Sequence, residues 1–257
     1  MTVTYMRRGP AGRTVVMLHG IGGGAESFAP QLDQLSDAFD VVSWNMPGYG
    51  GSPLDGPMTF AGLAGALEAM LDGLGAARAD IVGHSIGGMV AQEFVHTRPQ
   101  RVRSLVLSGT TSAFGSRDGS FQEQFVRERL APLDAGRSMA DLAEAAAPNL
   151  VGPAADPAAV PAIRAAMAAV PADTYRAAIR CLASFDRRDE LPSIAVPALL
   201  IAGEADRNAP ARTMESMSRK IAGSRYECLA GTGHLAPLEQ PARFNALLRA
   251  FLQSVPA

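Results

Sequence analysis

The stretch Gly83-His84-Ser85-Ile86-Gly87-Gly88 decides the fold of this chain. It is a G-x-S-x-G pattern that joins an apolar run at residues 79–82, which predicts a short buried strand, to residues 89–95, which have helical periodicity. A serine on such a strand-to-helix turn presents its hydroxyl above the sheet, and the flanking glycines remove Cβ atoms that would clash there. The helix N-terminus behind it offers amide N–H groups to a developing oxyanion. In a chain with 26 glycines, a G-x-S-x-G pattern can occur by chance. It is strong evidence for a nucleophilic serine only if an acid and a histidine follow it in the sequence.

An acid and a histidine do follow the serine. An apolar segment at residues 198–202 predicts a strand that ends in a polar loop, and this loop carries Asp206. Another predicted strand, at residues 225–229, precedes His234. The order Ser, Asp, His, each at the C-terminal end of a predicted parallel strand, is typical of α/β-hydrolases. Glu204 is the rival acid and is expected to be a solvated loop carboxylate.

The chain resembles the α/β-hydrolase superfamily along its whole length apart from a variable middle. Besides the serine turn, the resemblance rests on TVVMLHG at residues 14–20, NMPGYGGS at 45–52 and PLEQP at 237–241. It implies a nucleophile at Ser85, a base at His234 and an acid at Asp206, which orients the histidine and stabilises its imidazolium form.

The resemblance also implies an oxyanion hole built from two backbone N–H groups. One belongs to Ile86, the residue after the nucleophile, and the other to Ile21 in the glycine-rich loop at residues 19–24. The glycine run leaves Gly22 as an alternative second donor. His19, which opens the loop, is expected to orient it through hydrogen bonds. Loss of one oxyanion donor typically costs about 3 kcal/mol of barrier.

Alternating strands and helices predict an α/β fold with a mostly parallel sheet covered by helices on both faces. Short apolar segments predict strands at residues 3–6, 14–18, 41–44, 80–82, 102–108, 198–202 and 225–229. Helical stretches lie between most of them.

The pattern changes between residues 112 and 189, where no strand-like run occurs. Helices are expected near residues 121–130, 139–147, 158–169 and 174–184, with prolines at or between their ends. An all-helical block at this point is where related hydrolases carry a lid over the active site. We therefore expect a core domain of residues 1–111 and 190–257 and a helical lid of residues 112–189. The alanine-rich part of the lid could form a linker, but Ile163, Met167 and Val170 are spaced as an apolar helix face.

Composition narrows the class of protein. With 257 residues, 47% of them hydrophobic, the chain can bury a large core without disulfides or metals. A net charge of −2 gives no electrostatic basis for binding nucleic acid or an anionic membrane. No run approaches the roughly 18 apolar residues of a membrane span, and the N-terminus lacks an apolar signal core. We expect a cytoplasmic protein, a monomer or small homo-oligomer, that acts on a small-molecule substrate.

Neither a metal nor a cofactor is predicted. The four histidines are dispersed, and Cys181 and Cys228 lie far apart without ligand spacing. The glycine-rich loop is not followed by Lys-Ser/Thr, so it does not form a phosphate-binding loop.

The residue types narrow the reaction within the superfamily. A serine nucleophile excludes the aspartate branches, the haloalkane dehalogenases and epoxide hydrolases. The single lysine, Lys220, lies outside the lid and excludes hydroxynitrile lyases that depend on a lid lysine. The length, the four-helix lid and the lid exit at residues 175–197 are similar to 3-oxoadipate enol-lactonases and neighbouring carboxylesterases. This resemblance implies hydrolysis of a small ester or lactone through an acyl-enzyme. Carbon–carbon hydrolysis of ring-cleavage products and non-catalytic ligand binding are the alternatives.

Several residues are candidates for contact with the substrate. Phe28, Trp44, Phe114 and Leu235 are proposed as pocket walls. Among the many lid arginines, Arg180 is chosen as a partner for a substrate carboxylate, since it lies beside the junction of lid and core.

Overall fold

The computed structural model describes residues 3–256, and within them seven strands form one sheet in the order β1-β3-β2-β4-β5-β6-β7. The strands are β1 (Tyr5–Arg8), β2 (Thr14–Leu18), β3 (Asp40–Trp44), β4 (Ala79–His84), β5 (Val102–Ser108), β6 (Ala198–Gly203) and β7 (Arg225–Leu229). Only β1 runs antiparallel to its neighbour, β3. The predicted mostly parallel sheet is confirmed. The first strand begins two residues later than predicted, because Tyr5–Arg8 is the segment that pairs with β3 at the sheet edge.

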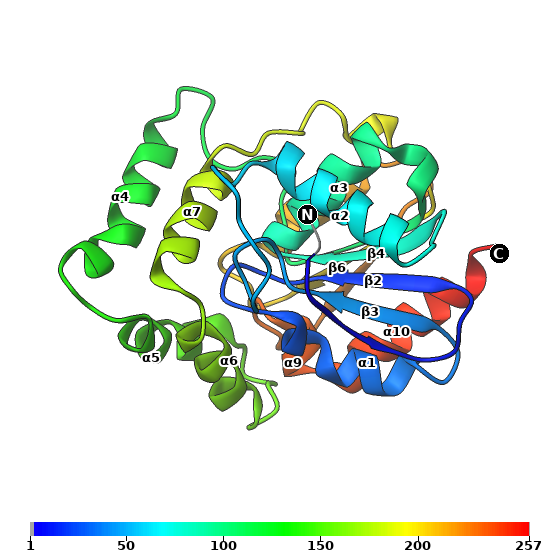
Figure 1. Ribbon diagram of the computed structural model, residues 1–257, viewed down its shortest axis with the longest axis horizontal. Helices are drawn as coiled ribbons and strands as arrows, with labels where there is room; N and C mark the ends of the chain where they lie inside the picture. Colours follow the sequence, from blue (N-terminus) through cyan, green and yellow to red (C-terminus); the bar gives the residue numbers. More distant parts are fainter. Residues whose placement is uncertain (1–2, 257) are drawn as a thin grey trace.

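Helices cover both faces of the sheet (Figure 1). One face carries α1 (Ala29–Leu35) and α10 (Pro241–Ser254), and the other carries α2 (Phe60–Gly73), α3 (Ile86–Thr97) and α8 (Ala211–Ser218). Val15 and Met17 of β2 point into the first core, whereas Val16 and Leu18 point into the second. Because both faces are buried, β2 is apolar throughout after its first residue, without polar alternation. Four short elements complete the core: η1 (Ala25–Phe28), η2 (Pro99–Arg101), η3 (Leu191–Ser193) and α9 (Ala236–Glu239).

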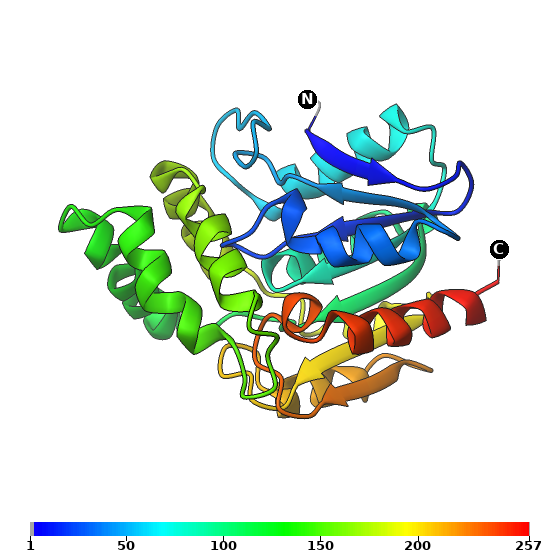
Figure 2. The ribbon, with the colours of Figure 1, turned by 90° about the horizontal axis from the view of Figure 1, so that it is seen from below.

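Four helices form a separate layer beyond the carboxyl ends of the strands, as Figures 1 and 2 show. They are α4 (Ser120–Asp134), α5 (Met139–Leu150), α6 (Ala159–Ala168) and α7 (Ala172–Ala183). Helix α4 packs against α7, and α5 packs against α6. The two ends of this segment meet in an antiparallel bridge between Ala113 and Asp186. The four predicted helices are confirmed, and the alanine-rich part forms α6, because Ile163 and Met167 bury one of its faces.

A buried carboxylate ties the amino ends of the strands together. The side chain of Asp80, at the start of β4, is fully buried and accepts two hydrogen bonds from the Arg13 guanidinium, at 2.7 and 2.8 Å. Ser104 Oγ donates a third at 2.6 Å, and Arg103 lies 3.4 Å away. This network lies at the end of β4 opposite Ser85.

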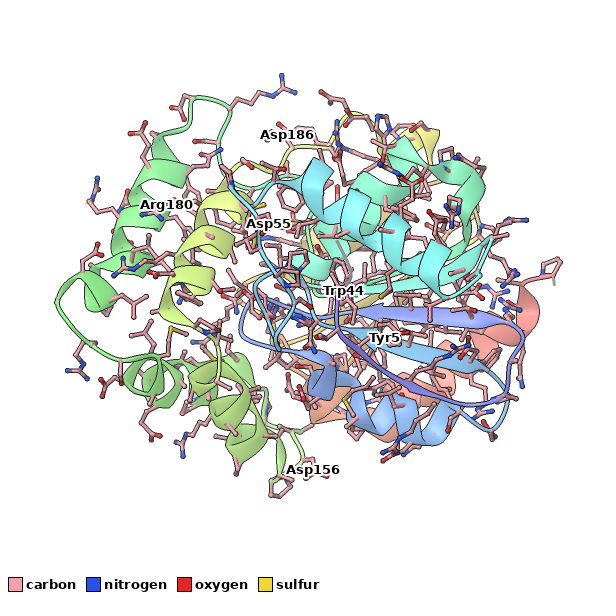
Figure 3. The ribbon with its side chains drawn as sticks, in the orientation of Figure 1. Tyr5, Trp44, Asp55, Asp156, Arg180 and Asp186 are labelled. Atoms are coloured by element: carbon pink, nitrogen blue, oxygen red, sulfur yellow. The ribbon has the colours of Figure 1, made fainter. Side chains whose placement is uncertain are left out.

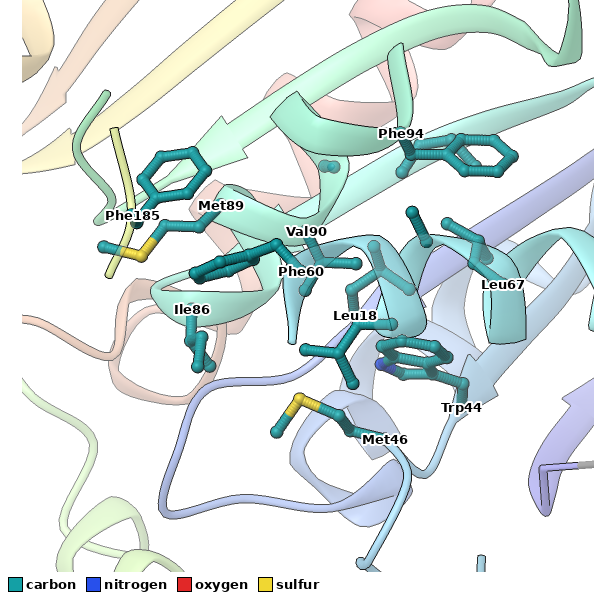
Figure 4. Close-up of a cluster of buried hydrophobic side chains, with 14 of the residues drawn as sticks. Leu18, Trp44, Met46, Phe60, Leu67, Ile86, Met89, Val90, Phe94 and Phe185 are labelled. Carbon is teal, nitrogen blue, oxygen red and sulfur yellow. The ribbon is translucent and has the colours of Figure 1, made fainter. Parts of the chain in front are cut away.

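The prediction that Trp44 lines a substrate pocket is wrong. Trp44 ends β3, is fully buried and packs among Leu18, Met46 and Leu67 (Figure 4). The side chains of Trp44 and Val42 lie on the same face of β3, because they are two residues apart in the strand. This face belongs to the core beneath α2.

Candidate active site

Ser85 occupies a strained turn between β4 and α3. Its backbone has φ 54° and ψ −123°, and it is the one non-glycine residue with positive φ in the described part of the chain. Such a conformation costs about 1–3 kcal/mol and persists only where the surroundings impose it. A Cβ on Gly83 would lie 2.4 Å from the Gly87 carbonyl oxygen, and one on Gly87 would lie 2.1 Å from the Leu18 carbonyl oxygen. The glycines therefore allow α3 to begin directly against the sheet.

The structure brings together Ser85, His234 and Asp206, which come from the loops after β4, β7 and β6. His234 Nε2 lies 3.1 Å from Ser85 Oγ, and His234 Nδ1 lies 2.8 Å from Asp206 Oδ2. An ionised carboxylate only accepts hydrogen bonds, so the histidine proton belongs on Nδ1. The lone pair of Nε2 then faces the serine hydroxyl, as a general base requires.

Asp206 is held as an anion. Burial raises the pKa of this carboxyl, but the hydrogen bond and charge of His234 lower it more, together with the amides of Ala209 and Asn208. Those amides donate to Asp206 Oδ1 at 3.0 and 2.7 Å. The pKa of Asp206 therefore lies below its ordinary value. Glu204 is exposed and accepts from the Gly231 N–H instead, as predicted for a solvated loop carboxylate.

The glycine-rich loop lies against Ser85 and is held by two side chains. A Cβ on Gly20 would lie 3.3 Å from Ser85 Cβ. His19 Nδ1 donates to the Gly20 carbonyl at 2.7 Å, and His19 Nε2 accepts from the Met46 N–H at 3.0 Å, so the predicted orienting role of His19 is confirmed. Burial lowers the pKa of His19 to about 4, which keeps the ring neutral. The Tyr49 hydroxyl donates to the Ile21 carbonyl at 2.9 Å.

Two predicted oxyanion donors flank this loop and the serine. Ile86 is the first residue of α3, so its N–H has no acceptor within the helix. Within residues 3–256 the Ile21 N–H and the Gly22 N–H donate to no protein acceptor either. These amides are available to an oxygen bound beside Ser85.

His84 is a buried neighbour of His234. Its ring centroid lies 5.0 Å from that of His234. Burial, followed by the charge of His234, lowers the pKa of His84 to about 3. Neither ring nitrogen has a partner among the described residues, so His84 is a neutral packing group rather than a second base.

A cavity of about 290 Å³ opens onto Ser85 and His234, between the strand ends and the layer of helices α4 to α7. Of the predicted walls, Phe28, Phe114 and Leu235 line it, whereas Trp44 and Arg180 do not. Most of its surface is apolar and comes from both layers, including Ile21, Met89, Phe121, Phe125, Leu150, Ile163, Met167, Ile179 and Leu182.

The prediction that Arg180 faces the substrate is wrong. Tyr175, Ile179 and Leu182 lie at helical spacing on the face of α7 that lines the cavity. Arg180 follows Ile179 directly, and its side chain is exposed (labelled in Figure 3).

Among the arginines of α4 to α7 in the described chain, Arg129 lines the cavity, and it was not among the predicted substrate contacts. Phe121, Phe125 and Arg129 are spaced by four residues on α4, so they share one face of the helix. The guanidinium lies 5.4 Å from the centroid of the Phe125 ring and makes no ion pair within residues 3–256. Tyr175, which also lines the cavity, was missed as well. The four-residue spacing on α4 was the signal that could have identified Arg129.

No three His, Cys, Asp or Glu side chains among residues 3–256 gather as a metal site. Over the same span, every helix is too short or too polar to cross a bilayer.

A parallel sheet with serine, aspartate and histidine at its carboxyl edge, beneath a helical layer, defines a class of α/β proteins. Residues 13–241 match the family described as alpha/beta hydrolase fold, and the chain belongs to this family. It is 28% identical to the pimeloyl-acyl-carrier-protein methyl ester esterase of Neisseria meningitidis, over 94% of this chain and 93% of that protein. The enol-lactonase of Burkholderia xenovorans superposes with a TM-score of 0.86 at 26% identity, over 98% of this chain and 96% of that one.

A third relative is much longer. The chain is 36% identical over 136 residues to the dihydrolipoyllysine-residue acetyltransferase component of the acetoin cleaving system of Cupriavidus necator. The match covers 51% of this chain and 36% of that protein. Taken with the esterase and the lactonase, the family identifies this chain as an enzyme that hydrolyses esters or lactones.

Proposed function

We propose that this protein cleaves a small carboxylic ester or lactone through an acyl-enzyme formed on Ser85. The observation that carries the proposal is the continuous chain of hydrogen bonds from Ser85 Oγ through His234 to Asp206. A serine hydroxyl is a weak nucleophile, and a histidine base held by a buried carboxylate is the arrangement that activates it.

The first half of the reaction acylates the serine. Ser85 Oγ attacks the carbonyl carbon while its proton passes to His234 Nε2, and Asp206 stabilises the imidazolium ion. The N–H groups of Ile86 and Ile21 bind the tetrahedral oxyanion. When this intermediate collapses, the leaving oxygen takes the proton from His234. In a lactone, that oxygen stays attached to the acyl group.

The second half releases the product. His234 takes a proton from water, the hydroxide attacks the acyl carbon, and the same N–H groups bind the second oxyanion. The ester bond to Ser85 then breaks, Ser85 Oγ regains the proton from His234, and the carboxylic acid leaves.

The cavity supports a small, mainly apolar substrate. Its volume of about 290 Å³ lies just below the usual range for small-molecule sites, roughly 300–1,000 Å³. The relatives named as a methyl ester esterase and an enol-lactonase support the ester and lactone classes.

Labelling and turnover test this function together. A fluorophosphonate probe should label Ser85 in the wild type, and Ser85→Ala should lose both labelling and p-nitrophenyl acetate hydrolysis. The expected loss in kcat is on the order of 10⁴–10⁶-fold. Ser193→Ala, on the exposed η3, is the control and should behave as the wild type. Turnover that survives in Ser85→Ala would overturn the mechanism. A panel of esters, lactones and ring-cleavage dienes separates ester from carbon–carbon hydrolysis, and binding without turnover of any of them would indicate a receptor.

A further inference from the structure

Glu239 is a buried carboxylate beside the proposed base. It ends α9 and is 1% exposed. Its Oε2 accepts from the N–H groups of Gly233 and Gly152, both at 2.7 Å, and its Oε1 accepts from the Leu235 N–H at 2.8 Å. Gly233 and Leu235 are the two neighbours of His234, whereas Gly152 follows the lid helix α5. One carboxylate therefore binds both sides of the base and the lid.

The partners of Glu239 are all backbone amides. Within residues 3–256 no arginine, lysine or histidine forms an ion pair with it. Hydrogen bonds to a carboxylate are roughly twice as strong as neutral ones, and a buried charge requires them. Because these amides belong to the main chain, the three bonds fix the path of the backbone on each side of His234.

The lid backbone also packs directly on the His234 loop. The His234 N–H donates to the Leu150 carbonyl at 2.7 Å. A Cβ on Gly152 would lie 2.2 Å from the Gly231 carbonyl oxygen, and one on Gly233 would lie 2.6 Å from the Leu150 carbonyl oxygen. The two segments therefore fit only without side chains between them.

From this geometry we propose that Glu239 is a positioning residue, which holds His234 at Ser85 and couples the base to the lid. The proposal rests on the proposed function, since it takes His234 as the base. Leu150 lines the cavity and receives the His234 N–H, so the wall of the cavity and the base are parts of one bonded unit. A displacement of this unit changes the distance from His234 Nε2 to Ser85 Oγ.

Glu239→Gln tests the positioning role. The substitution replaces one of the two carboxylate oxygens by an NH₂ group, which donates and cannot accept. Depending on which oxygen is replaced, either the Leu235 N–H or the N–H groups of Gly152 and Gly233 then face a donor in place of their acceptor. We expect kcat to fall by roughly 10- to 100-fold, because a shift of about 1 Å in a catalytic group can cost 10²-fold, while KM changes far less. Glu204→Gln is the matched control. It makes the same chemical change in an exposed carboxylate that accepts from Gly231 alone, and its kcat should equal that of the wild type.

A second readout does not depend on turnover. The downfield proton resonance of the His234 Nδ1–H reports its bond to Asp206, and it should shift or broaden in Glu239→Gln but not in Glu204→Gln. Circular dichroism at the same temperature establishes that each variant is folded. A folded Glu239→Gln with wild-type kcat and an unchanged resonance would overturn the proposal. If the wild type hydrolyses no ester, the proposed function fails, and the resonance still decides whether Glu239 positions His234.

Gly152→Ala tests the coupling from the lid side. The added methyl group has to displace the Gly231 carbonyl, so we expect kcat to fall with a shift of the same His234 resonance. A folded Gly152→Ala that keeps both at the wild-type value would refute the coupling to the lid.

Discussion

Two buried histidines should make this protein lose stability between pH 7 and pH 5. Burial lowers the pKa of His19 to about 4, and burial together with the charge of His234 lowers that of His84 to about 3. In the unfolded chain both side chains titrate near 6.5. Between these values the unfolded state binds protons that the folded state does not, so stability falls as the pH falls from about 7 towards 4.

The size of the loss follows from the shifts. Each pKa unit corresponds to about 1.36 kcal/mol of free energy. A pH of 5 lies about 1.5 units below the pKa of about 6.5 that each histidine has in the unfolded chain. His19 and His84 therefore cost about 2 kcal/mol each, or about 4 kcal/mol together, against a typical stability of roughly 5–15 kcal/mol. The lowered pKa of Asp206 acts in a different window, because the stability from a depressed carboxyl is lost only below about pH 4.

Urea unfolding at intervals from pH 5 to pH 8 measures the effect. His84→Leu should remove about half of the loss between pH 7 and pH 5, because it removes one of the two buried imidazole rings. His96→Leu is the control, because that ring is exposed on α3. The quantity compared between the wild type and each variant is the stability lost between pH 7 and pH 5, not the stability at one pH. If His84→Leu loses as much stability as the wild type over this range, His84 is not a buried neutral group.

Three further outcomes are expected. Arg129→Ala should raise KM for carboxylate-bearing esters by roughly tenfold but leave KM for neutral esters unchanged. Arg180→Ala should change KM for neither kind of ester. Equal effects of Arg129→Ala on both kinds of ester would exclude Arg129 as a carboxylate partner. Asp80→Ala should lower the free energy of unfolding by about 3–5 kcal/mol, since it leaves Arg13 without its partner, yet leave kcat unchanged at 25 °C. Ser85→Gly should be about 1 kcal/mol more stable than Ser85→Ala in urea unfolding, because glycine accepts the positive φ, and equal stabilities would show that the turn is unstrained.

The proposed reacting groups could be located from the sequence because their chemistry demands particular residue types at particular places. A serine in this turn needs a histidine base and an acid, and only glycine fits at the positions beside it that pack against the sheet. The loops after parallel strands share one edge of the sheet, so the order Ser85, Asp206, His234 was enough to bring the three together.

The cavity walls were harder to predict, for two physical reasons. The strand that carries Trp44 is buried on both faces, so alternation of polar and apolar residues gave no indication of which side a residue faces. Arg180 was a different error. The spacing of Tyr175, Ile179 and Leu182 already placed it off the buried stripe of α7, and the same test applied to Phe121 and Phe125 leads to Arg129.

The residues that hold the loops share a property that hides them in the sequence. Glu239 and Tyr49 bond to backbone N–H and C=O groups, and His19 does so with both ring nitrogens. Every residue except proline has both a backbone N–H and a backbone C=O group. The residue that supplies the backbone partner can therefore be of almost any type, and its identity in the sequence does not indicate the bond. Gly152 lies 87 residues from Glu239, and nothing in the chain pairs these two positions except the absence of a side chain at one of them. A carboxylate that follows an apolar segment is therefore only a weak sequence sign of a residue that binds main-chain amides. Glu239 follows three apolar residues, but Arg243 stands four residues further on, so the sequence by itself favours an ion pair between them. In the structure Arg243 donates to Gln240 instead, and the Glu239 carboxylate is left to the backbone amides.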